Sequence, residues 1–417
     1  MHSPADNPTT EHRWLRRFTY VVIVATFSLI AIGGHVTSTD VGLAVPDGFT
    51  TFGHNTLLAP LEVWWYDFGT RWEHGHRLKG KVVGMLTIVM AVWLLIVFRD
   101  RSRDRPSRTL IGRSLSIVHR LRMTYEGPRP LLRIAGLIML VAVSSQGVMG
   151  ALRVSEISLT LAFVHGICGQ LILCGWIVIA ASLSMPWLRR LAPLRTAQRE
   201  HATVLLRWAV RVLLVLLLLQ LTLGSAVRHF KADKAIPDFP LTYGHVLPPM
   251  SQETLDERYI EFHAAPKGIT AAMAEQEGLV SNRTPQGEIV VALSDVDLQF
   301  AHRIGAVVVC LLGLYVIIAA IRRSGDQGIV LAPALFVLAL FSTQFALGVF
   351  TVLSGTAPIV ATLHQATGAV LIAASTWLAV RIHLAEYAPV ARMADAINIQ
   401  TIAPPQPAPT KRTPVTA

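Results

Sequence analysis

The chain has 417 residues, of which 52% are hydrophobic and 15% are charged, and its formal net charge at pH 7 is +11. A typical soluble domain has about 25% charged residues, so this composition excludes an ordinary soluble enzyme and indicates a membrane protein. The positive charge argues for a membrane topology rather than for nucleic-acid binding, because the arginines are concentrated between a few apolar stretches.

Eight stretches are apolar and long enough to cross a bilayer, which requires about 20 residues of helix. In chain order they cover residues 18–36, 78–98, 134–152, 159–185, 204–227, 301–321, 330–353 and 359–380. Clusters of arginine precede the first stretch and follow the second, fourth and sixth, so the positive-inside rule places both termini in the cytoplasm. We therefore predict a multi-pass protein of a bacterial cytoplasmic membrane.

The three cysteines of the chain all lie inside predicted spans, which argues against a disulfide framework in the outer loops. They are Cys168, Cys174 and Cys310.

The two halves of the chain share a series of landmarks in the same order. "GGHVTSTDVGLAVPD" and "GSAVRHFKADKAIPD" follow the first and fifth spans, and "HR" opens the second and sixth. "SSQGVMG" and "STQFALG" mark the third and seventh spans, and "FVHGICGQLIL" and "TLHQATGAVLI" mark the fourth and eighth. The sequence therefore predicts an all-α polytopic fold of two pseudo-symmetric four-helix bundles.

The predicted organisation has four parts. Residues 1–16 form a cytoplasmic segment, and residues 17–200 form the first bundle. Residues 201–383 form the second bundle with a long outer loop over 228–298, and residues 384–417 form a cytoplasmic, Pro-rich, disordered tail.

Four histidines occupy repeat-related positions near the outer side of the predicted bundles. His76 and His302 open their spans, whereas His165 and His364 lie about six residues inside theirs. Zinc usually takes four ligands, so two imidazoles on facing helices fit the axial positions of haem iron better. Interhelical hydrogen bonds are the alternative role. We give no functional role to His2, His12, His119, His201 or His383.

Charged residues beside these histidines differ between the halves. Glu73 precedes His76 by three residues, where the second half has Gln299 before His302. The ionisable group in the first half suggests that one site does chemistry and the other binds or passes electrons, unless Glu73 only caps its helix. Four arginines on the outer side are candidates to bind haem propionates or to act as interfacial anchors: Arg77, Arg153, Arg228 and Arg303.

These residues together resemble the haem A synthase family over about residues 17–383. The resemblance rests on the order and duplication of the motifs above, with "EHGHRLKG", "IPDFPLTYG" and "AHRIG". It implies an oxidoreductase that converts the C8 methyl of haem O to a formyl group, with oxygen from water, for cytochrome oxidase assembly. It also implies substrate haem ligands His76 and His165, a haem b cofactor on His302 and His364, and Glu73 as the catalytic carboxylate.

The chain departs from this family at one feature. Many relatives have a cysteine pair in the first outer loop, and some have another in the loop after the fifth span. Here the matching positions hold Val45 and Thr51, then Ile236 and Thr242. A thiol–disulfide step is therefore not expected, the electron acceptor is unknown, and the 228–298 loop is a candidate docking site for a partner. His35 and His54 are possible auxiliary groups in the first loop.

Two other functions share the four histidines. A dihaem b-type cytochrome would relay electrons without needing Glu73, and a haem-handling or transport protein would do no chemistry. A haem O synthase is disfavoured because we find no paired Asp-rich motifs for magnesium and diphosphate. For a haem A synthase the expected partners are the lipid bilayer, haem O and a haem O synthase.

Overall fold

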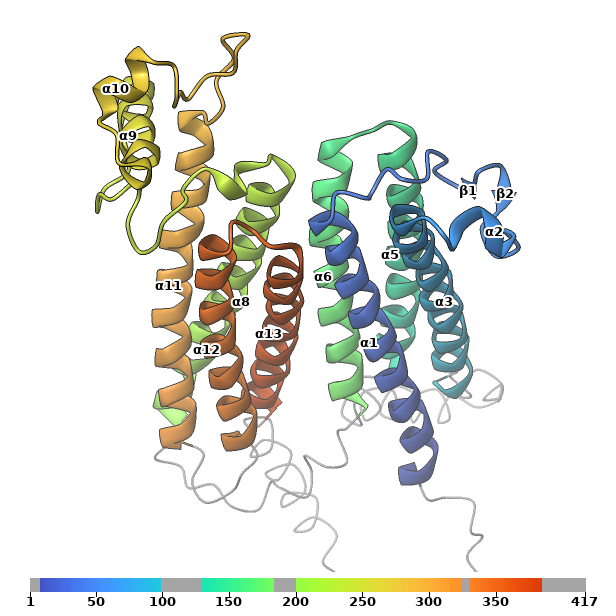
Figure 1. The fold of residues 1–417 in the computed structure, drawn as a ribbon. Coiled ribbons are helices and arrows are strands. Elements are labelled where there is room, and N and C mark those ends of the chain that lie inside the picture. Colours follow the sequence, from blue (N-terminus) through green and yellow to red (C-terminus); the bar gives the residue numbers. More distant parts are fainter. Residues whose placement is uncertain (1–7, 99–128, 184–199, 324–329, 385–417) are drawn as a thin grey trace, which may run out of the picture.

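The computed structural model describes residues 8–98, 129–183, 200–323 and 330–384 (Figure 1). Its eight long helices each contain a window long and apolar enough to cross a membrane. In the first half they are α1 (Pro8–Ser38), α3 (Phe68–Val97), α5 (Arg129–Ser155) and α6 (Leu159–Ser182). In the second half they are α8 (Glu200–His229), α11 (Leu293–Arg323), α12 (Leu331–Leu353) and α13 (Pro358–Leu384). The predicted all-α, eight-span fold class is confirmed.

Each half closes into a ring of four helices. In the first half α1 packs on α3, α3 on α5, α5 on α6 and α6 on α1, and the second half repeats this order with α8, α11, α12 and α13. Buried aliphatic and aromatic side chains fill each ring, including Trp176 in the first and Phe341 in the second. The first and fourth helices of each half also form the contact between the halves.

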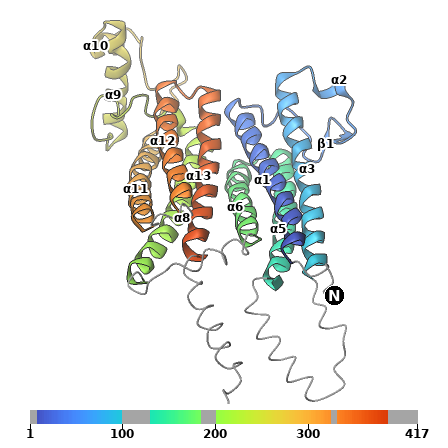
Figure 2. The same ribbon diagram turned by 90° about the horizontal axis from the view of Figure 1, so that it is seen from below.

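The two bundles stand side by side with α6, α1 and α13 between them (Figures 1 and 2). Leu173 of α6 packs with Ala369 and Ala373 of α13 in a small core that α1 also lines. Small residues on α13 let the helices approach closely, as is common between membrane helices.

Two long connections, 39–67 and 230–292, lie at the same end of the bundles, which we call the long-loop end (Figure 1). The first contains strands β1 (Thr50–Thr51) and β2 (His54–Asn55), which pair antiparallel, and the short helix α2 (Leu61–Trp64). The second contains α9 (Gln252–Ala264), α10 (Ala271–Gln276) and two 3₁₀ turns, η5 (Ala232–Lys234) and η6 (Ala265–Lys267). α9 and α10 lie beyond the end of α11 in Figure 1.

The repeat extends into both connections as the same tight turn. Phe52 and Gly53 have positive φ angles of 49° and 79°, and Tyr243 and Gly244 have 53° and 78°. An aspartate closes each turn, because Asp47 accepts from the Gly53 N–H at 2.6 Å and Asp238 accepts from the Gly244 N–H at 2.8 Å. The Gly53 N–H, the Thr50 hydroxyl and the charge of Arg77 hold the pKa of Asp47 below its usual value, despite the opposing effect of burial.

Several element boundaries differ from those expected. α3 and α11 begin at Phe68 and Leu293, well before the predicted starts at 78 and 301, because polar turns packed under the connections extend each helix beyond its apolar window. The long loop therefore covers 230–292 rather than 228–298. α1 begins at Pro8, inside the segment expected to precede the bundle. The arginine-rich connections 99–128 and 184–199 and the tail 385–417 lie outside the described residues.

Candidate functional site

The first half brings His76 of α3 and His165 of α6 together in its interior. His76 lies eight residues after the start of α3, and His165 lies six residues after the start of α6. At about 1.5 Å per residue both imidazoles are about 9–12 Å below the long-loop end of their helices. His76 is thus not at the mouth of its helix, as the sequence suggested, but at nearly the depth of His165. A charge on one imidazole would act on the other.

The second half repeats this pair with His302 of α11 and His364 of α13. His302 follows the start of α11 by nine residues, and His364 follows the start of α13 by six. These two rings are also within electrostatic reach of each other. Both pairs therefore lie at one end of the molecule and at similar depth.

Each of the four imidazoles packs against a glycine of the preceding long helix. A Cβ added at Gly33 would lie 2.8 Å from Cε1 of His76, and one at Gly150 would lie 3.0 Å from Cε1 of His165. The corresponding distances in the second half are 2.9 Å for Gly224 and His302, and 3.1 Å for Gly348 and His364. A side chain at Gly33 or Gly224 would force the ring to shift, and one at Gly150 or Gly348 would press against it, so the glycines help to fix the positions of the rings.

The donor set suits haem iron. Within the described residues, no group of three or more His, Cys, Asp or Glu side chains could hold a metal ion, so each pair stands without further ligands of these types. Nδ1 of His76, His165 and His364 is buried without a hydrogen-bond partner in the same part of the chain. Buried polar atoms are usually paired, so these three ring nitrogens are candidates to contact a bound group, whereas Nε2 of His364 already lies 3.4 Å from Nε2 of Gln344. Two axial imidazoles in an apolar bundle fit the requirements of a six-coordinate haem iron.

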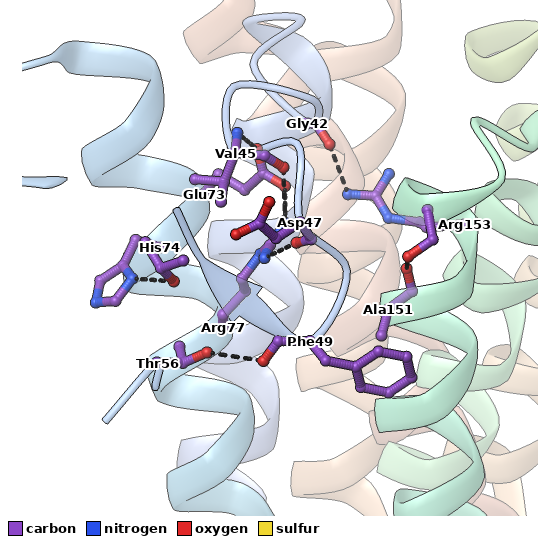
Figure 3. A network of polar contacts seen from close by, with 12 residues as sticks. Gly42, Val45, Asp47, Phe49, Thr56, Glu73, His74, Arg77, Ala151 and Arg153 are labelled. Atoms are coloured by element: carbon purple, nitrogen blue, oxygen red, sulfur yellow. Dashed lines mark hydrogen bonds and ion pairs between the residues drawn. The ribbon is translucent and has the colours of Figure 1, made fainter. Parts of the chain in front are cut away.

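Glu73 is almost completely buried, with 1% of its surface exposed. Oε2 accepts a hydrogen bond from the Val45 N–H at 2.8 Å, and Oε1 accepts from Arg77 at 2.7 Å (Figure 3). In the second half Oε1 of Gln299 accepts from the Ile236 N–H at 2.5 Å. Glu73 and Gln299 therefore share a structural task, which is to hold the connection after the first helix of the half, and they differ in the carboxylate.

Arg77 and Arg303 clamp the same loop positions of their respective halves. Arg77 donates to the carbonyl oxygens of Val45 at 3.0 Å and Thr50 at 2.9 Å, and also to that of Asp47. Arg303 donates to three repeat-related carbonyls, those of Ile236 (3.2 Å), Asp238 (2.9 Å) and Leu241 (2.9 Å). The guanidinium groups of both arginines therefore already donate to carbonyl groups of the protein, and a role of these arginines in binding propionates stays a prediction.

The other two arginines lie nearer the boundary of the halves. Arg153 of α5 makes one long hydrogen bond, 3.4 Å to the Gly42 carbonyl (Figure 3). The charge of Arg153 also acts on His165. Arg228 of α8 pairs with Asp233 at 2.6 Å and donates to the Thr37 carbonyl of α1 at 2.7 Å. Arg228 therefore ties the second half to the first, whereas Arg153 keeps most of its donors available to a bound carboxylate.

Sequence reasoning missed His229, because the repeat gives it no histidine counterpart. It ends α8 in the second half, yet its Nε2 lies 3.9 Å from the position that a Cβ of Gly166 would occupy in the first half. The charge of Arg153 also acts on it. The only sequence signal for this residue is its place in "GSAVRH", one position after Arg228.

Three other histidines lie in or next to the first connection, in α1, β2 and α3. His74 of α3 is buried, and its Nδ1 forms a 3.0 Å hydrogen bond with the Thr51 hydroxyl. Its ring also stacks on that of Trp64, with the ring centroids 4.3 Å apart. His35 packs edge-on against Trp72 at 4.3 Å, and His54 is exposed in β2. None of these contacts adds a ligand to the imidazole pairs. The three cysteines are free, as expected.

Comparison with known proteins identifies the family of the chain. Residues 16–376 match the family described as cytochrome oxidase assembly protein. Three relatives named "Heme A synthase" illustrate the similarity. A protein from Novosphingobium aromaticivorans is 39% identical over 94 residues, which are 22% of this chain and about a quarter (25%) of the relative. One from Chelativorans sp. is 24% identical over 399 residues, which cover 88% of this chain and 91% of the relative. One from Rhodopseudomonas palustris is 27% identical over 314 residues, or 74% and 68% of the two chains. The chain belongs to the haem A synthase family of cytochrome oxidase assembly proteins.

Proposed function

We propose that this protein is a haem A synthase that oxidises the C8 methyl of haem O to a formyl group. The observation that carries the proposal is the pair of imidazoles in each bundle, each ring packed on a glycine, together with the buried Glu73 three residues before His76, where the second half has Gln299 before His302. The names of its relatives support the same activity.

The two pairs take different haems in this proposal. His302 and His364 hold haem b, which supplies one-electron redox chemistry when bound. His76 and His165 hold the substrate, so that the C8 methyl is presented on the side of Glu73. Arg153 binds a propionate of the substrate, because its donors are little used and it lies near His165.

The reaction converts a methyl group and one water into a formyl group, four protons and four electrons. Glu73 serves as a proton acceptor or stabilises positive charge that develops on the methyl carbon. The hydrogen bonds from Val45 and Arg77 fix both of its oxygens, so the carboxylate is positioned before the substrate arrives. The electrons leave to an acceptor other than a loop disulfide, since the loop positions hold Val45 and Thr51.

The location follows from the same proposal. The arginine distribution supports a bacterial cytoplasmic membrane with both termini in the cytoplasm and the long-loop end outside. Haem O arrives from the bilayer or directly from a haem O synthase.

The test is to express the full chain in cells that also make haem O synthase and lack their own haem A synthase. Extracted haems are then separated by chromatography. Haem A, or the C8 alcohol that precedes it, is the expected product. Recovery of haems B and O alone would contradict the proposal and would favour electron relay or haem transport.

A further inference from the structure

The first connection continues, after the turn that it shares with the second, into an apolar segment over residues 57–68, "LLAPLEVWWYDF". No residue of this segment is buried. Six of its large apolar side chains are exposed: Leu57, Leu58, Leu61, Trp65, Tyr66 and Phe68. The exposed fraction reaches 80% at Leu58 and 78% at Tyr66. So many exposed apolar side chains in one segment indicate an interaction site rather than a surface in contact with water.

The segment is attached to the first bundle by one of its two tryptophans. The ring of Trp64 stacks on that of the buried His74, with the ring centroids 4.3 Å apart. Asp67, near the end of the segment, caps the N-terminus of α3 with its side chain. Trp64 thus faces the protein, whereas its neighbours Trp65 and Tyr66 are exposed.

The segment lies beside the first turns of α3, on the side of the first bundle that faces away from the second (Figures 1 and 2). α3 has 30 residues, so it is about 45 Å long, which matches the thickness of a bilayer with both headgroup regions. When α3 spans the membrane, its first turn therefore lies at the level of the lipid headgroups, and the segment ends in that turn.

The exposed surface of the segment continues onto an exposed side of α3. Phe68, Gly75, Val82 and Val89 follow one another at intervals of seven residues, nearly two helical turns, so they share one face of the helix. Val82 and Val89 are exposed within a helix apolar enough to cross a membrane, and a Cβ at Gly75 would meet nothing within 4 Å. This face of α3 therefore borders lipid, and Phe68 connects the segment to it.

The residue types of the segment are typical of a membrane interface. Tryptophan and tyrosine are enriched where a bilayer meets water, because their rings are apolar and each carries one polar group. Arg71 of α3 lies over the rings of Trp65 and Phe68, with its guanidinium carbon 5.7 Å and 5.9 Å from their centroids. A cation among these rings suits the level of the lipid phosphates.

The second connection has a different character after the shared turn. Its helix α9 has 13 residues, and the charged ones are Glu253, Asp256, Glu257, Arg258 and Glu261. α9 lies beyond the end of α11 rather than beside a bundle (Figure 1). A helix of this composition and position is suited to water, whereas residues 57–68 contain only two charged residues, Glu62 and Asp67.

We propose that residues 57–68 form an interfacial anchor, whose exposed apolar side chains lie among the headgroups and upper acyl chains of the bilayer at the long-loop end. The proposed anchor is independent of the proposed function. Its position has a consequence for Glu73, because the Val45 N–H of the same connection donates to that carboxylate. The membrane thus supports the loop that covers Glu73.

The test compares Leu58→Cys with the matched control Glu257→Cys, which lies at an exposed position of α9. The three native cysteines are replaced by alanine, a nitroxide label is attached, and the full chain is placed in phosphatidylcholine–phosphatidylglycerol vesicles. Electron paramagnetic resonance then measures collisions with oxygen, which concentrates in lipid, and with a water-soluble nickel chelate. We expect oxygen to be preferred at position 58 and nickel at position 257.

A preference for nickel at both positions would overturn the proposal, because the segment would then lie in water. Protection of position 58 from both reagents would also overturn it, because a protein surface would then cover the segment. A second measurement keeps the native cysteines and compares the fluorescence of Trp65→Phe with that of the unmodified chain. The emission lost in the variant should be quenched by lipids brominated near the headgroup and little by aqueous iodide, and the opposite pattern would contradict the anchor.

Discussion

The two halves of the molecule share a framework and differ in the polar groups placed on it. Both have an imidazole pair on glycines, an arginine that clamps three loop carbonyls, and an aspartate that closes the following turn. The first half adds Glu73 and Arg153 where the second has Gln299 and Thr351. Shared residues thus build the same framework in both halves, and under the proposed function the exchanged residues divide the work between substrate and cofactor.

Replacing one imidazole at a time should reveal the largest functional difference between the two halves. If the second pair holds haem b as proposed, His302→Ala is expected to abolish its binding, because the remaining ligand, His364, cannot hold a six-coordinate iron alone. His76→Ala should retain that haem but form no detectable haem A. Pyridine haemochrome spectra of purified protein and chromatography of extracted haems measure the two effects. Equal loss of haem b in both variants would remove the distinction between the halves.

Glu73→Gln sharpens the comparison, because it turns the first half into a copy of the second at this position. Gln299 shows that an amide can accept the loop N–H, so the connection should stay in place. We expect product formation to fall about 10²- to 10⁴-fold, the range typical of a lost general acid or base. Haem binding should be unaffected, and Gln299→Glu is the control that should leave product formation unchanged. Normal product formation in Glu73→Gln would exclude a chemical role for the carboxylate.

Glycine replacements test whether the rings are held equally in both halves. Gly33→Ala places a methyl group 2.8 Å from Cε1 of His76, and Gly224→Ala places one 2.9 Å from Cε1 of His302. Overpacking costs about 1–3 kcal/mol, which corresponds to about a 5- to 150-fold loss of affinity. Haem titration of the purified variants should show the loss in the corresponding half only.

Gly75→Ala is the control for these variants, since a Cβ there would meet nothing within 4 Å. It should bind haem as the unmodified chain does. A comparable loss in Gly75→Ala would mean that helix α3 tolerates no added methyl group and that the glycine contacts are not specific.

The smallest expected effect concerns acid stability of the turn in the first half. The folded-state pKa of Asp47 is below its usual value of 3.8, so its contribution to stability is present above about pH 3.8 and is lost as the pH falls through the lower folded value. Hydrogen exchange of the Gly53 amide, corrected for its intrinsic pH dependence, should therefore rise at acid pH. Asp47→Asn should remove this dependence, and a persistent one would assign it to another group.

Much of the fold and of the site was predictable because periodic apolar content and duplication are encoded locally. The eight spans, the repeat and the four histidines follow from single stretches such as "TLHQATGAVLI" compared with their counterparts. The first residues of α3 and α11 could not be predicted in this way. Hydropathy locates the apolar part of a helix, and polar turns can extend the helix beyond that part.

Contacts between distant helices were not predictable from either half alone. The approach of His229 to Gly166 depends on how α8 crosses α6, and the loop clamp of Arg77 depends on how residues 45–50 fold back over α3. From the sequence we predicted that Arg77 binds a haem propionate. The sequence shows that an arginine lies near the outer end of the span, but it does not show the loop carbonyl groups that surround its guanidinium group.

The interface between the halves has a consequence for which partner each half can pack against. A Cβ at Gly34 of α1 would lie 1.6 Å from Oε1 of Gln365 of α13, whereas at the symmetry-related crossing Ser225 of α8 faces Gly166 of α6. The larger side chain therefore lies on the fourth helix of its half, α13, at one crossing and on the first helix of its half, α8, at the other. A dimer of two identical first halves would leave a hole at both crossings, and a dimer of two second halves would place Ser225 against Gln365. The two halves therefore fit each other better than either half would fit a second copy of itself.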